Sequence, residues 1–165
     1  MPQGPAARVT DTVAHPLPPM LSPGPGSVNV MIGFLPAWRG IPLAAAAALQ
    51  SAKAAADATV QAAVAATAVA TGPAMPAAYA AEQAAKTAVL SSMSSAITGA
   101  AAGADIHMCA TPSPVPPHGP GVVINGSATV MINNLPACRL GDTIMEALGP
   151  PNTITKGEPT VIIGG

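Results

Sequence analysis

One segment of this chain occurs twice, with a shorter third copy. Residues 26–39 (GSVNVMIGFLPAWR) align without a gap with residues 126–139 (GSATVMINNLPACR), and residues 157–164 (GEPTVIIG) repeat the first part. Each copy combines a glycine start, a β-branched apolar run and a turn, which predicts strands joined by tight hairpins. Copies of one such unit usually pack on each other and share a core. The repeats therefore restrict the fold to a small β structure built from equivalent units.

A second repeated element is an arginine followed three residues later by an aspartate. Two such pairs are Arg8 with Asp11 and Arg139 with Asp142. After Arg39, the expected aspartate is replaced by Pro42, while Asp105 precedes the second strand copy. We therefore interpret residues 42–103 as an insertion that divides this element. We expect the arginines and aspartates to form ion pairs inside the β structure rather than a catalytic site.

The insertion is rich in alanine, the strongest helix former. The cluster at residues 71–76 (TGPAMP) contains the glycine and prolines that end one helix and begin another. We predict helices over roughly residues 43–70 and 76–98, folded as an antiparallel hairpin. Two pairs are spaced i,i+4 and are expected on the helix surfaces: Lys53 with Asp57, and Glu82 with Lys86.

Composition excludes several classes of protein. Charged residues make up 8 % of the chain, the net charge is −1 and the pI is about 6.2, so no basic face for nucleic acid or an anionic membrane is indicated. Two cysteines are too few for a disulfide scaffold, and the alanine runs are too weakly apolar for a membrane span. The first residues show no signal-peptide pattern. We expect about one domain, made in the cytoplasm.

Histidine and cysteine residues gather where the repeats predict equivalent loops. His15 and Cys109 each lie four residues after the aspartate of their repeat, His107 precedes Cys109 by two residues, and His118 lies in a proline-rich loop. Three histidines and one thiolate form a closed set of four donors, which is typical of structural zinc. We expect one zinc ion per chain, bound by His15, His107, Cys109 and His118. Binding would add folding free energy to a chain with few large side chains.

Two further residues are alternatives for this site. Glu146 lies four residues after Asp142, so it occupies in the third repeat the position that His15 has in the first. Cys138 takes the position of Trp38 in the strand copies, where a packed side chain is more typical than a ligand. The sequence leaves open whether either replaces one of the four proposed ligands.

These motifs together resemble the PAAR-repeat proteins, the conical tips of type VI secretion spikes and related contractile injection machines. The resemblance covers residues 1–41 and 104–165. It implies one discontinuous domain, a pseudo-threefold conical β-prism, interrupted by the helical hairpin at residues 42–103. It also implies a blunt base that docks on a trimeric VgrG-type spike protein, and a metal near the apex bound by histidines and cysteine.

The function implied is structural: a tip that sharpens the spike for membrane piercing and carries or recruits effector cargo. We expect no enzymatic activity, no nucleic-acid partner, assembly in the cytoplasm, export with the spike into the target cell or medium, and transient membrane contact on delivery. The helical hairpin is expected to lie against the prism or to bind an effector or chaperone. The alternatives are a small zinc-dependent hydrolase, although no HExxH motif is present, and an effector whose hairpin inserts into a target membrane.

Overall fold

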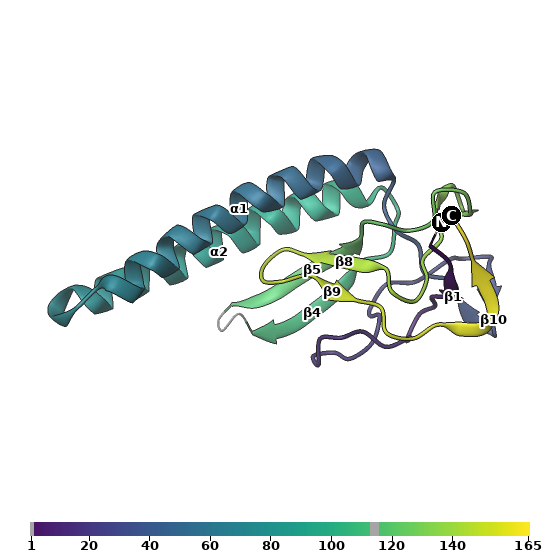
Figure 1. The fold of residues 1–165 in the computed structure, drawn as a ribbon, viewed down its shortest axis with the longest axis horizontal. Coiled ribbons are helices and arrows are strands. Elements are labelled where there is room, and N and C mark those ends of the chain that lie inside the picture. The colour runs from purple at the N-terminus through teal and green to yellow at the C-terminus, as the bar shows by residue number, and fades with distance from the viewer. Residues whose placement is uncertain (1, 113–115) are drawn as a thin grey trace.

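The structure is a computed structural model that describes residues 2–112 and 116–165. A small β part carries a long helical hairpin that reaches beyond the ends of the strands (Figure 1). The fold therefore mixes a β-rich part with a helical insertion, which confirms the predicted fold class. The helical elements are α1 (Leu43–Val69), the 3₁₀ turn η1 (Gly72–Ala74) and α2 (Met75–Ala101). The strands are β1 (Gly4–Ala6), β2 (Met31–Ile32), β3 (Leu35–Pro36), β4 (His107–Pro112), β5 (Pro117–Val123), β6 (Met131–Ile132), β7 (Leu135–Pro136), β8 (Thr143–Glu146), β9 (Asn152–Thr153) and β10 (Glu158–Ile163).

The three strand copies form three equivalent antiparallel pairs. β2 pairs with β3 and β6 with β7 in the same register, and β10 pairs with β1 from the other end of the chain. The facing residues are Met31 with Pro36, Met131 with Pro136, and Ile162 with Pro5. The predicted turns are also present, because Gly33, Phe34, Asn133 and Asn134 all have positive φ. The pairing of β10 with β1 was not predicted, and it completes the third unit.

The three units meet around a pseudo-threefold axis. The backbone N–H of Ala7 donates to the carbonyl of Cys138 at 2.9 Å, Trp38 donates to Ala7 at 2.9 Å, and Cys138 donates to Trp38 at 3.1 Å. These three hydrogen bonds close a ring in which each unit binds the next. Next to the ring lies a small core in which every position occurs three times: Ala6, Ala37 and Ala137, with Ile32, Ile132 and Ile163.

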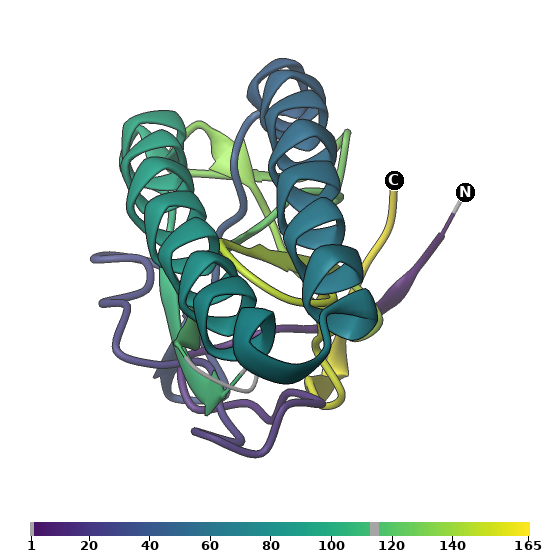
Figure 2. The same ribbon diagram turned by 90° about the vertical axis from the view of Figure 1, so that its left-hand side faces the viewer.

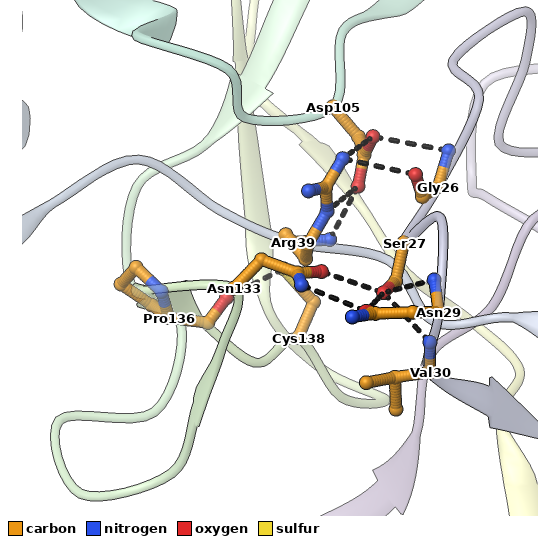
Figure 3. A network of polar contacts seen from close by, with 9 residues as sticks. All are labelled: Gly26, Ser27, Asn29, Val30, Arg39, Asp105, Asn133, Pro136 and Cys138. Carbon is orange, nitrogen blue, oxygen red and sulfur yellow. Dashed lines mark hydrogen bonds and ion pairs between the residues drawn. The ribbon is translucent and has the colours of Figure 1, made fainter.

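Three buried arginine–aspartate pairs repeat with the three units. The pairs and their closest side-chain distances are Arg8–Asp11 at 3.0 Å, Arg39–Asp105 at 2.8 Å and Arg139–Asp142 at 3.1 Å. In each pair the aspartate also accepts the backbone N–H of its arginine, at 2.8, 2.8 and 2.9 Å. Figure 3 shows Asp105 between the guanidinium of Arg39 and the N–H of Gly26. Arg39 and Asp105 therefore form the same element as the other two pairs, with the hairpin between them in sequence.

The helices α1 and α2 lie side by side, and the β part lies on one side of the pair (Figure 2). Leu49, Val89, Met93 and Ile97 are buried in their shared core, which continues into the β part through residues such as Val122. The helices begin and end within a few residues of the predicted positions. In the described residues, no helix combines the length and the apolar character needed to span a membrane.

The charged pairs of the hairpin form as predicted, but both lysines and Glu82 are buried, and only Asp57 is partly exposed. Lys53 pairs with Asp57, and Lys86 pairs with Glu82 at 2.7 Å. Lys53 and Lys86 are only 7 % and 4 % exposed. The lysine stems are therefore packed inside the protein, while each ammonium group keeps a carboxylate partner on its own helix.

Candidate metal centre

Four side chains converge between the strands of the largest sheet. They are His15 from the loop after Asp11, Cys109 from β4, His118 from β5 and Glu146 from the end of β8, and their donor atoms all lie within 4.8 Å of one another. Three of them, His15, Cys109 and Glu146, occupy the same position, four residues after the aspartate of their repeat. The pseudo-threefold arrangement therefore supplies three donors, and His118 is added from outside this pattern.

The distances suit one small metal ion. Glu146 Oε2 lies 3.0 Å from His15 Nδ1 and 2.7 Å from His118 Nδ1, while Cys109 Sγ lies 3.6 Å from His15 Nδ1. Tetrahedral zinc, with bonds of about 2.0–2.3 Å, requires donor separations of roughly 3.3–3.8 Å, which small side-chain adjustments would reach. Two imidazoles and a thiolate favour zinc-like transition metals over Mg²⁺ or Ca²⁺, which prefer oxygen ligands. The cluster can therefore hold a metal ion.

The burial of Glu146 also favours a metal ion in this cluster. Its side chain is 0 % exposed, and among the described residues it has no arginine or lysine partner, only contacts with the rings of His15, His107 and His118. Every other acidic side chain of the chain lies in a described segment and pairs with an arginine or lysine. A buried carboxylate needs a compensating cation or protonation. A bound metal ion would supply that charge.

Asn152 fixes two of the four donors. Its Nδ2 donates to Glu146 Oε1 at 3.0 Å, and its Oδ1 accepts the backbone N–H of His15 at 3.0 Å. The Asn152 side chain is fully buried. It thus turns Glu146 Oε2 toward the histidines and holds the His15 loop, as residues behind metal ligands commonly do. Sequence reasoning missed Asn152, because it lies outside the repeated motifs.

His107, included in the expected ligand set, lies beside this cluster rather than within it. Its Nε2 is 3.9 Å from Glu146 Oε1 and has no hydrogen-bond partner among the described residues, while Nδ1 accepts a long 3.4 Å bond from the N–H of Ser22. Burial lowers the pKa of His107 and favours the neutral ring. Its place in the repeat, two residues after the aspartate, is held by Val13 and Ile144 in the other units, and both are core residues.

The two cysteines have different surroundings. Cys109 points into the cluster, and burial raises the pKa of its thiol, so metal binding there must displace a proton. Cys138 is packed in the core beside Trp38, with its Sγ 3.9 Å from the carbonyl of Pro136. Burial raises the pKa of Cys138 well above its usual value. Cys138 is therefore a packed side chain, the role that the sequence favoured.

Exposed apolar side chains lie on the three strand pairs. Met31, Met131 and Ile162 occupy equivalent positions and are 55 %, 52 % and 55 % exposed. Phe34, at the turn between β2 and β3, is 95 % exposed. In Figure 1, β1 and β10 lie at the end of the β part opposite the tips of β4 and β5. That end carries exposed apolar side chains repeated by the pseudo-threefold axis.

One of three comparisons with known proteins gives a match, and it agrees with the repeats. A family model described as the PAAR motif matches residues 114–165, a segment that contains His118, Glu146 and the third strand copy. Comparison with curated proteins and with solved structures found no match. The match to the PAAR motif supports a role related to type VI spike tips in general. The chain thus contains a PAAR motif at residues 114–165, consistent with a PAAR-repeat protein.

Proposed function

We propose that this chain is the tip of a type VI or related contractile injection spike, a structural protein that sharpens the spike for membrane piercing. The observation that carries the proposal is the pseudo-threefold β part built from one chain, together with the PAAR motif. Three similar but non-identical repeats around one axis let a single polypeptide match the threefold symmetry of a trimer at one end. We further propose that residues 1–41 and 104–165 form this tip domain, and that residues 42–103 are an insertion in it.

The partner proposed for the end that carries β1 and β10 is a VgrG-type trimer. The three equivalent side chains Met31, Met131 and Ile162 give this end a repeated apolar contact for three equivalent protomers. Exposed apolar residues gathered on one face are typical of protein interfaces. Because all three equivalent positions carry apolar side chains, the contact would depend mainly on shape complementarity and on burial of apolar surface.

The metal proposed is one structural zinc ion, held by His15, Cys109, His118 and Glu146. Four protein donors leave no position for a reactive water, which argues for a structural rather than a hydrolytic role. In this assignment Glu146 takes the fourth place, and His107 lies beside the site, with its Nε2 3.9 Å from Glu146 Oε1. Zinc would tie β4, β5, β8 and the His15 loop together.

The helical hairpin is the proposed place for effector or chaperone contacts. Its closed end extends beyond the strands in Figure 1 and carries Val69, Met75 and Tyr79, which are 79 %, 52 % and 51 % exposed. Replacing these three side chains with serine should reduce recovery of any such partner with the tagged chain, while binding to the spike trimer stays unchanged.

The central experiment is co-purification with the VgrG-type protein of the producing cell. Met31→Glu combined with Met131→Glu places two charges on the docking end and should abolish the complex. Met108→Glu is the matched control, because Met108 is similarly exposed, at 45 %, but lies on β4. Loss of binding in both variants, or in neither, would reject the proposed docking end.

A further inference from the structure

We propose that the inserted hairpin positions the metal ligand His118, so that packing of the helices and metal binding are energetically coupled. This inference rests on the proposed function in one respect, namely that the four-residue cluster binds metal. His118 is the one donor of the cluster that does not lie four residues after a repeat aspartate. Its support must therefore come from contacts other than the repeated ones.

The first contact comes from Lys53 of α1. Its Nζ donates to the carbonyl of Gly149 at 3.1 Å, and it also pairs with Asp57. Gly149 lies directly on the His118 ring, since a Cβ added there would be 2.4 Å from His118 Nε2. The preceding residue, Leu148, donates its N–H to the carbonyl of His118 at 2.9 Å. Lys53 thus holds the short segment that covers the ring on the side away from Glu146.

The second contact comes from Leu90 of α2. A Cβ added to Gly119 would be 2.5 Å from Leu90 Cδ1, so this leucine lies against the backbone next to His118. Gly119 has φ +80, a conformation that glycine adopts without strain. The turn of the backbone at this position is therefore covered by α2 directly beside the ligand.

Together these contacts confine His118 between the hairpin and the cluster. Its Nδ1 faces Glu146 Oε2 at 2.7 Å, Gly149 covers Nε2, and Leu90 covers the following residue. Holding a ligand in its binding geometry before the metal arrives raises the affinity. Linkage is reciprocal, so metal binding must stabilise the docked hairpin by the same free energy.

The test uses two buried lysine pairs of the same hairpin. Lys53→Met with Asp57→Asn removes the contact to Gly149 and leaves no unpaired charge. Lys86→Met with Glu82→Gln is the matched control, because Lys86 is similarly buried and also pairs within its own helix, whereas the hydrogen bond to Gly149 comes from Lys53. Zinc affinity is measured by competition with a chelating dye on the full-length protein.

We expect the Lys53 variant to bind Zn²⁺ about tenfold more weakly than wild type, at the low end of the effect of residues that orient ligands. The control should stay within about twofold of wild type, while Leu90→Ala provides a second variant that should weaken binding. Equal affinities for the Lys53 variant, Leu90→Ala and the control would overturn the inference while leaving the metal site intact. Absence of zinc binding by the wild type would reject the proposed metal site itself.

Amide hydrogen exchange of the wild type provides the reciprocal measurement. Adding Zn²⁺ should slow exchange in α2 around Leu90 and in α1 around Lys53, because these turns hold the bound ligand. Exchange near Tyr79, at the closed end of the hairpin, should not change. Protection limited to the strands, with no change in either helix, would contradict the coupling.

Discussion

The ion pair that spans the insertion provides a quantitative test of the fold. Asp105 is 0 % exposed and accepts four N–H groups: the backbone N–H of Gly26 at 3.1 Å, and from Arg39 the backbone N–H at 2.8 Å, Nε at 3.0 Å and Nη2 at 2.8 Å. Asp105→Asn preserves the shape of the side chain but removes its charge. It also turns an NH₂ group toward N–H donors of Arg39, which is only 7 % exposed.

The expected loss follows from the burial of both partners. Removing one partner of a buried ion pair costs about 3–5 kcal/mol, because the other charge remains buried and unpaired. For a domain of this size, about 1 kcal/mol shifts the melting temperature by roughly 2–4 °C, so Asp105→Asn should lower it by roughly 6–20 °C. Asp11→Asn should cost less, because Arg8 keeps a second carboxylate partner in Glu158.

The assay is denaturant unfolding in saturating Zn²⁺, followed by the fluorescence of Trp38, the only tryptophan and 1 % exposed. Arg39→Met combined with Asp105→Asn removes both charges and should recover part of the loss, because no unpaired charge remains. A cost below about 1 kcal/mol for Asp105→Asn would refute the reasoning. So would a double variant that is no more stable than the single one.

Three further predictions concern the site and the core. Asn152→Ala should weaken zinc binding by about 10–100-fold, as measured by chelator competition, because Glu146 and the His15 loop lose their shared hydrogen-bond partner; an unchanged affinity would contradict the role given to Asn152. Glu146→Gln should lower the zinc content of the purified protein, measured by elemental analysis, whereas His107→Ala should leave one zinc per chain; the opposite pattern would place His107 in the ligand set. Above pH about 8.5 the unfolded Cys138 thiol loses its proton while the buried thiol keeps it, so the free energy of unfolding should fall as pH rises, by about 1 kcal/mol per unit. Cys138→Ala should remove this part of the pH dependence, measured as the free energy of unfolding from denaturant titrations at pH 8.5–9.5. The same pH dependence in both proteins would show that the folded thiol ionises normally.

The sequence predicted those features that repeat. The spacing of arginine and aspartate located the insertion, and Arg39 and Asp105 do form the same buried pair as Arg8 with Asp11. The helices followed from alanine content and from the breakers at residues 71–76. These predictions succeeded because each depends on local propensity or on a repeated motif, both of which are visible in one sequence.

Features that depend on tertiary contacts were harder to predict. The pairing of β1 with β10 joins the two ends of the chain, so no local pattern indicates it. Glu146 was visible as an alternative ligand from its place in the repeat, but choosing between it and His107 requires knowing which position faces the cluster. The burial of Lys53 and the role of Asn152 depend on neighbours far away in sequence.

The most direct test of the account is the stoichiometry of the complex with the VgrG-type spike protein, measured by native mass spectrometry. Three similar but non-identical repeats around one pseudo-threefold axis predict one copy of this chain on each spike trimer. The Met31→Glu and Met131→Glu double variant should leave the trimer bare. Three copies per trimer, or no complex with the wild-type chain, would contradict the proposal that this protein is a single tip matched to a threefold spike.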